Sequence, residues 1–122
     1  MFLYVTVPIT GISIISPPIT SNNTVTVTTD QPITFQCKTT QGRPASNVTW
    51  YLDNAPMSGG TTTTTTVSGD MVITTGSLTL TVNMTADYKV ISCRATNYVN
   101  MEPVESTEKP VIRVKCKTTC FL

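Results

Sequence analysis

Apolar and polar residues alternate at every second position through much of the chain, which is the period of a β-strand with one buried face. Segment 33–39 reads ITFQCKT and segment 47–53 reads NVTWYLD, so each places three apolar side chains on a single face. The same alternation recurs in segments 77–83 and 89–95. These inward positions predict a core that includes Phe35, Trp50, Leu52, Leu78, Leu80 and Ile91.

Turn-forming residues separate the alternating segments. Gly, Pro, Asn, Asp and Ser cluster near positions 30, 43, 55, 59 and 69, where a chain reverses most easily. Further strands are predicted at 24–28, 71–74 and 111–115, and the polar stretch 97–109 is predicted to be a long hairpin loop. About eight short strands with regular turns are typical of an all-β sandwich or barrel.

The first fifteen residues are uncharged and largely apolar. A cleaved signal peptide has a basic first region and a small-residue cleavage site, and this stretch has neither. It is also shorter than the about 20 residues of a membrane-spanning helix. We therefore expect strand pieces at 2–6 and 12–15, with residues 1–13 an extension or the remnant of a preceding segment and Met1 the start of a fragment. A membrane attachment would need an anchor outside this sequence.

A run of six threonines occupies positions 61–66. Because threonine is β-branched, the run suits an exposed or flexible edge strand. O-linked glycans or an ice-binding array are the alternatives, but consecutive strand residues alternate faces, so only about three threonines share one surface. We expect an edge strand, with O-glycosylation left open.

Composition and charge argue against catalysis and nucleic-acid binding. Charged residues make up 12% of the 122 residues, the net charge is +1, and no basic patch stands out. The chain has no histidine for a Ser–His or Cys–His dyad. Its acidic residues fall in predicted turns, strand ends and one loop, and no glycine-rich phosphate cradle is present. We expect no enzymatic activity, no cofactor, no metal and no small-molecule substrate.

Three features predict an extracellular or cell-surface protein of the secretory pathway. The sequence contains three N-glycosylation sequons, at Asn22, Asn47 and Asn83. The predicted surface is rich in Thr, Ser and Asn, and two of the four cysteines have a spacing that favours a structural bridge.

Cys37 and Cys93 fall on the inward faces of their predicted strands, with Trp50 between them in sequence. This Cys–Trp–Cys order resembles the immunoglobulin signature, in which the three residues lie on strands B, C and F. The resemblance implies a Greek-key β-sandwich of two antiparallel sheets over residues 14–115. It also implies an inter-sheet Cys37–Cys93 disulfide against which the indole packs.

Longer segments resemble the adhesion-type C2 and I-set domains of the nephrin, Kirre and nectin kind. Segment 37–51 is similar to their B-to-C region, segment 77–82 to their strand E, and segment 91–97 to the end of their strand F. Ile91 occupies the position where this family often has a corner tyrosine, and Tyr88 is the candidate for a displaced corner. A missing corner argues against a variable-type domain and fits the C2 type.

Cys116 and Cys120 lie in a tail, residues 116–122. A structural zinc site usually needs four protein ligands, and this chain offers no histidine to complete one. A local bridge, or pairing with a neighbouring domain or a second chain, is the expected alternative.

The resemblance implies protein recognition at a cell surface, with a homophilic or heterophilic protein partner. The outward residues of the predicted C and F strands form the candidate face, because Tyr and Arg are enriched at binding hot spots. The predicted partner-binding residues are Thr49, Tyr51, Ser92 and Arg94. A glycan on Asn47 would crowd this face, whereas Asn83 is expected to point from the opposite sheet.

Two alternatives use the same fold differently. A secreted immune-type domain would bind a foreign or soluble ligand through loops 38–46 and 97–109. A structural spacer in a multi-domain ectodomain would bind nothing itself.

Overall fold

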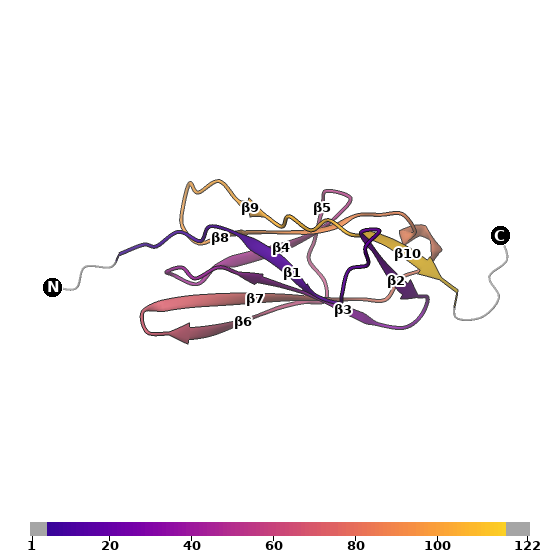
Figure 1. Ribbon diagram of the computed structural model, residues 1–122, viewed down its shortest axis with the longest axis horizontal. Coiled ribbons are helices and arrows are strands. Elements are labelled where there is room, and N and C mark those ends of the chain that lie inside the picture. Colours follow the sequence, from indigo (N-terminus) through magenta and orange to yellow (C-terminus); the bar gives the residue numbers. More distant parts are fainter. Residues whose placement is uncertain (1–4, 117–122) are drawn as a thin grey trace.

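The computed structural model describes residues 5–116, which form two stacked β-sheets (Figure 1). The first sheet has the strand order β1 (Ile12–Ser16), β3 (Ile33–Thr39), β7 (Met71–Leu80) and β6 (Thr61–Ser68). The second has the order β5 (Ala55–Met57), β4 (Asn47–Leu52), β8 (Ile91–Thr96) and β9 (Val104–Glu105). All neighbouring strands within these two sheets are antiparallel, which confirms the predicted all-β sandwich.

Two more strands and a single helical turn complete the fold. β2 (Thr24–Thr28) pairs in parallel with β10 (Val111–Lys115), and the 3₁₀ helix η1 (Met84–Ala86) lies between β7 and β8. Pro17 and Pro18 separate β1 from β2, and the two strands pair with different partners. Proline cannot donate to a sheet ladder, so this is where the first strand can leave its sheet. No helix within the described range is long and apolar enough to cross a membrane.

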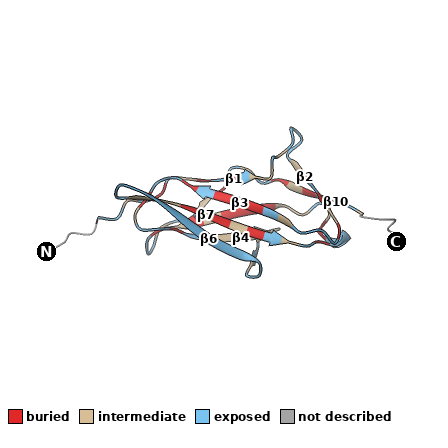
Figure 2. Ribbon diagram, turned by 90° about the horizontal axis from the view of Figure 1, so that it is seen from below, coloured by how far each residue is buried: buried red, intermediate tan, exposed pale blue. Residues whose placement is uncertain are grey.

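The core lies between the two sheets, and Figure 2 shows the buried stretches of the strands in red. A disulfide lies at its centre. Cys37 of β3 and Cys93 of β8, 56 residues apart in sequence, form the predicted bridge between the sheets. The rings of Phe35 and Trp50 pack beside it, with centroids 6.3 Å apart. Of the other predicted core residues, Leu78 and Ile91 are fully buried, and Leu52 and Leu80 are half-buried against the cluster.

Three predicted boundaries differ in the structure. Segments 71–74 and 77–83 were expected as separate strands, but β7 runs through Gly76 without a break. The expected long loop 97–109 contains the short strand β9, which pairs with β8. Of the strand piece expected at 2–6, Val5 and Thr6 are not in a strand, and the other three residues lie outside the described range.

The N-terminal segment packs against the sandwich before residue 14. Ile9 and Ile12 are buried in the core, and β1 begins at Ile12. Val7 exchanges backbone hydrogen bonds with Arg43, at 2.7 and 2.8 Å. The packed part of the chain therefore reaches seven residues further back than the predicted domain boundary.

Gly76 marks a close approach of the two sheets. It is buried in β7, opposite Cys37 in the register with β3. A Cβ atom at this position would lie 2.6 Å from Cγ1 of Val48, on the facing strand β4. Only glycine fits at position 76, because any side chain there would clash with Val48. The absence of a side chain lets β7 and β4 pack closely.

We expect Gly76→Ala to lower the free energy of unfolding by about 1–3 kcal/mol, because the added methyl group overpacks the core. Urea unfolding of the purified domain measures the change. Gly59→Ala is the matched control, since nothing lies within 4 Å of a Cβ at that position. Adding Val48→Ala should restore part of the loss, and equal stability of the two glycine variants would contradict the packing argument.

Replacing both Cys37 and Cys93 by alanine should cost about 2–5 kcal/mol of stability, because the bridge closes a loop whose entropy alone amounts to about 4 kcal/mol in the unfolded chain. The measurement is the urea midpoint of the double variant relative to the wild type. An unchanged midpoint would show that the sheets hold together without the cross-link.

Candidate protein-binding face

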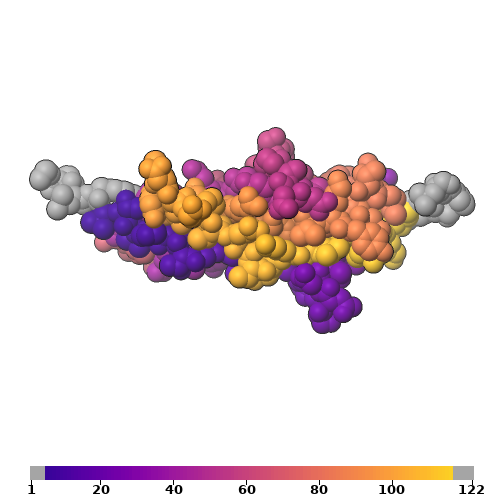
Figure 3. Space-filling model, turned by 90° about the horizontal axis from the view of Figure 1, so that it is seen from above, coloured from indigo at the N-terminus to yellow at the C-terminus, as the bar shows by residue number. Residues whose placement is uncertain are grey.

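The outward side of β4, β8 and β9 carries a stacked aromatic–cation pair. Tyr51 and Arg94 lie on adjacent antiparallel strands as diagonal neighbours, since Arg94 pairs with Thr49 and Tyr51 with Ser92. The guanidinium carbon of Arg94 is 4.1 Å from the centroid of the Tyr51 ring. Stacking of this kind is attractive because the ring face is electron-rich. Figure 3 looks onto this side of the sandwich.

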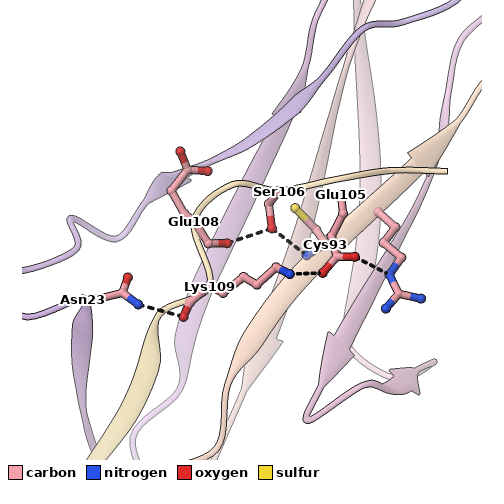
Figure 4. Close-up of polar contacts among 7 residues, drawn as sticks. Asn23, Cys93, Glu105, Ser106, Glu108 and Lys109 are labelled. Carbon is pink, nitrogen blue, oxygen red and sulfur yellow. Dashed lines mark hydrogen bonds and ion pairs between the residues drawn. The ribbon is translucent and has the colours of Figure 1, made fainter.

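Glu105 forms ion pairs with two basic side chains, Arg94 and Lys109. Its Oε2 atom lies 3.3 Å from Nε of Arg94, and its Oε1 atom lies 2.8 Å from Nζ of Lys109 (Figure 4). The hydrogen bond from Lys109 and the positive charges of Lys109 and Arg94 lower the pKa of the Glu105 carboxyl below its ordinary value of 4.5, against the opposing effect of burial. The guanidinium is therefore held between the ring and a carboxylate that stays ionised.

The segment that carries Glu105 and Lys109 is anchored by Ser106. The buried hydroxyl of Ser106 accepts a hydrogen bond from the backbone N–H of Cys93 at 3.2 Å and donates one to the carbonyl of Glu108 at 2.8 Å. Asn23 donates from Nδ2 to the carbonyl of Lys109 at 3.0 Å. Sequence reasoning missed this anchor, because these residues lie in a stretch whose only visible feature was polarity.

The structure brings together three of the four predicted binding residues. Thr49, Tyr51 and Arg94 line one shallow hollow, together with Asn47 and Pro103. The fourth, Ser92, was expected on the surface, and this is wrong, because Ser92 is only 4% exposed. The segment after β9 lies alongside this part of β8. Ser92, Glu105 and Lys109 line a second depression, separate from the hollow beside Tyr51.

The three sequon asparagines are exposed, at different places on the domain. Asn47 begins β4 and borders the hollow beside Tyr51. Asn83 lies after β7, where its Oδ1 caps η1 by accepting from the backbone N–H of Thr85 at 3.0 Å. Asn22 lies in the turn before β2. A glycan on Asn47 is thus the one that would border the candidate face.

Loops 38–46 and 97–109 meet at one end of the sandwich around Asn97. Its buried side chain donates from Nδ2 to the carbonyl of Val7 at 2.7 Å and of Pro44 at 3.3 Å, and its Oδ1 accepts from the N–H of Ile9 at 3.3 Å. The next two residues are exposed, Tyr98 by 43% and Val99 by 83%. The loop is thus tied down at its base and presents apolar side chains at its tip.

No tyrosine corner forms from Tyr88. Tyr88 is 66% exposed, and its ring centroid lies 4.1 Å from the guanidinium carbon of Arg113. The corner position Ile91 is buried in the core. Neighbouring Asp87 accepts from the N–H of Val114 at 2.8 Å and from Nε of Arg113 at 3.1 Å. These hydrogen bonds, the one from Val114 first, lower the pKa of the Asp87 carboxyl.

Residues 5–116 include no group of three or more His, Cys, Asp or Glu side chains placed to hold a metal ion. For Cys116 and Cys120 a local bridge and pairing with a neighbouring domain or a second chain were the expected alternatives, and Cys120 lies outside the described residues. The arrangement offers stacking, charge pairing and hydrogen bonding to a protein surface.

Comparison with known proteins identifies a family. Residues 14–104 match the family model of CD80-like C2-set immunoglobulin domains. No curated protein matches the sequence significantly.

Two solved structures have similar folds. The crystal structure of Rst D1-D2 aligns with a TM-score of 0.76 at 20% identity, over 90% of this chain and 51% of that one. The full ectodomain (Ig1–Ig3) of mouse nectin-like molecule 4 aligns with a TM-score of 0.62 at 14% identity, over 86% of this chain and 33% of that one. At these identities the likeness is one of fold, and this chain spans about half of one structure and a third of the other.

We expect the stability contributed by Glu105 to be lost in acid. A carboxyl whose pKa is lowered by folding stabilises the native state above its unfolded pKa, and this contribution disappears as the pH falls through the folded value. Glu105→Gln should therefore lower the urea midpoint more at about pH 6 than at about pH 3. Glu102→Gln is the control, an exposed carboxylate of the same loop with no ion pair among the described residues. The same loss at both pH values would contradict the ion-pair assignment.

Proposed function

The chain belongs to the CD80-like C2-set immunoglobulin domain family, and we propose that it is a non-catalytic protein-recognition module of a cell-surface adhesion or receptor-type protein. The partner is a protein on an apposed or neighbouring surface, either a like domain or a related one. Exposed sequons, the inter-sheet disulfide and the family support an extracellular setting. Within the adhesion-type domains, segments 37–51, 77–82 and 91–97 favour the nephrin, Kirre and nectin kind.

The observation that carries the proposal is the stacked Tyr51–Arg94 pair on the open face of the second sheet. Tyrosine and arginine are among the residue types enriched at hot spots in protein interfaces. Here both side chains are held before any partner arrives, Arg94 by the ring and by Glu105. Such preorganisation reduces the entropy lost when a side chain is immobilised on binding.

A hollow lies beside the Tyr51–Arg94 pair on the candidate face. Thr49 and Pro103 form its walls, and Asn47 borders it at the start of β4. We propose that Asn22, Asn47 and Asn83 all carry N-glycans, and that the Asn47 glycan restricts the direction from which a partner can approach. Removing that glycan should then widen access to Tyr51 without changing the pair itself.

A second candidate function is recognition through the loop end. The exposed Tyr98 and Val99 favour it, because large apolar side chains at a loop tip that is anchored at its base are typical of a binding loop. In that case the domain would bind a foreign or soluble ligand, and the face around Tyr51 would be ordinary surface. A spacer domain would be indifferent to changes at either place.

Self-association of the glycosylated domain separates these functions. We expect Tyr51→Ala or Arg94→Ala to weaken dimerisation in sedimentation, and aggregation of coated beads, by about tenfold or more, as truncation of a hot spot does. Tyr88→Ala is the matched control, because it removes the ring of an equally close stacked pair, at 4.1 Å from Arg113, away from the face.

Loss of association in Tyr98→Ala but not in Tyr51→Ala would move the binding site to the loops. Homophilic adhesion would be excluded if the wild-type domain stays monomeric in sedimentation and beads coated with it do not aggregate. A set of normal urea midpoints is needed for all variants, so that lost binding is not lost folding.

A further inference from the structure

β6 is an exposed edge strand. All eight of its residues, Thr61–Ser68, are exposed, and Figure 2 shows the strand pale blue along its length. It pairs with β7 over all eight residues without a shift in register, and its other edge has no strand partner in the sheet order. Positions 61–66 are all threonine, so three hydroxyls project on each side of the strand.

The other three edges of the two four-stranded sheets are protected against pairing with another chain. In β1 the N–H of Ile14 donates to a carboxylate oxygen of Glu108 at 2.9 Å, and the strand has an irregularity between Ile14 and Ser16. β5 has three residues, one of them Pro56, and β9 has two, one of them the ion-paired Glu105. Short length, proline, charge and irregularity are the usual means by which proteins protect a sheet edge.

β6 has none of these protections. It is the longest edge strand of the domain, and it contains no charged residue and no proline. Within the described part of the chain, the hydroxyls of positions 61–66 make no hydrogen bond, whereas those of Thr34 and Thr79 bond to each other at 2.9 Å and those of Thr39 and Thr74 accept from backbone N–H groups. The exposed chemistry of the strand is therefore six unengaged threonine hydroxyls on an unprotected edge.

We propose that the threonines of β6 carry mucin-type O-linked glycans. The inference rests on the proposed extracellular function, because the modification occurs in the secretory pathway. The substrate is a nucleotide-activated N-acetylhexosamine, supplied with its transferase by that pathway. The threonine Oγ1 bonds to the anomeric carbon, the bond from that carbon to the phosphate oxygen breaks, the nucleoside diphosphate leaves, and the hydroxyl proton passes to a base of the transferase.

Glycans at this position would supply the missing edge protection. A sugar on Oγ1 places a bulky hydrated group beside the free backbone of β6, which hinders pairing with another strand. β6 belongs to the sheet that does not carry Tyr51 and Arg94, and in Figure 1 it lies on the opposite side of the sandwich from β8 and β9. The modification would thus cover one sheet and leave the candidate face open.

The positions of the aspartates allow a direct test. The protein is secreted from cultured animal cells and cleaved before each aspartate, which releases peptide 53–69 with the complete threonine run and no sequon. Peptide 70–86 is the internal control, with five threonines from β7 and the segment after it. We expect mass spectrometry to find one or more N-acetylhexosamine additions on the first peptide, mapped to positions 61–66, and none on the threonines of the second.

A bare peptide 53–69 from protein whose sequon asparagines are glycosylated would overturn this inference and leave the extracellular proposal standing. Protein without glycans at any sequon would count against both. Equal O-glycosylation of peptide 70–86 would also overturn the inference, because exposure on β6 would then not be the cause.

A variant gives an independent test of the site. A sixfold variant removes all six hydroxyls and keeps a strand with a charged edge. Its inner-side changes are Thr61→Val, Thr63→Val and Thr65→Val, and its outer-side changes are Thr62→Lys, Thr64→Lys and Thr66→Lys. We expect the secreted variant to lose the whole O-glycan mass, whereas Thr26→Lys, Thr79→Lys and Thr81→Lys should leave it unchanged. If the wild type carries no O-glycan and forms dimers that the sixfold variant abolishes, β6 is instead an interface between copies of this chain.

Discussion

The bridge between Cys37 and Cys93 is the constraint from which the rest of this domain follows. It joins β3 of one sheet to β8 of the other, with the rings of Phe35 and Trp50 packed beside it. Once Cys93 points inward, its neighbour Arg94 must point outward, and the inward Trp50 places Thr49 and Tyr51 outward on the next strand. The candidate face is thus the outer side of the most tightly held part of the core.

Electrostatic interactions fix the position of the partly exposed Arg94 side chain, which core packing does not constrain. Many exposed arginines have several accessible rotamers, but Arg94 lies between a ring face and a carboxylate, and that carboxylate is shared with Lys109. The pair formed by Tyr88 and Arg113 shows that stacking alone does not define a binding face, since the same geometry occurs beside η1. What sets the Tyr51 pair apart is its place on an open sheet beside a hollow.

The two sheets differ in what they expose. The sheet with β4 and β8 presents aromatic, charged and amide groups around a shallow depression. The other ends in β6, whose exposed side chains are neutral hydroxyls with only Val67 as an apolar exception. Gly76 of β7 lets the two sheets pack closely at this point, because Val48 of β4 occupies the space that a side chain at position 76 would need. The proposed binding face and the proposed O-glycans thus lie on different sheets.

The sequence by itself determined most of the strands, the direction in which their side chains point and the centre of the core. Those properties depend on alternation and on turn residues, which are local, and the spacing of Cys37, Trp50 and Cys93 was enough to identify the fold. Tertiary structure alone decided which outward residues are accessible. Ser92 has the right parity but is buried, and Glu105 meets Arg94 from a segment that looked like a loop. The physical reason is that accessibility and ion pairing depend on which distant segment lies beside a strand, and no periodicity within the strand carries that information.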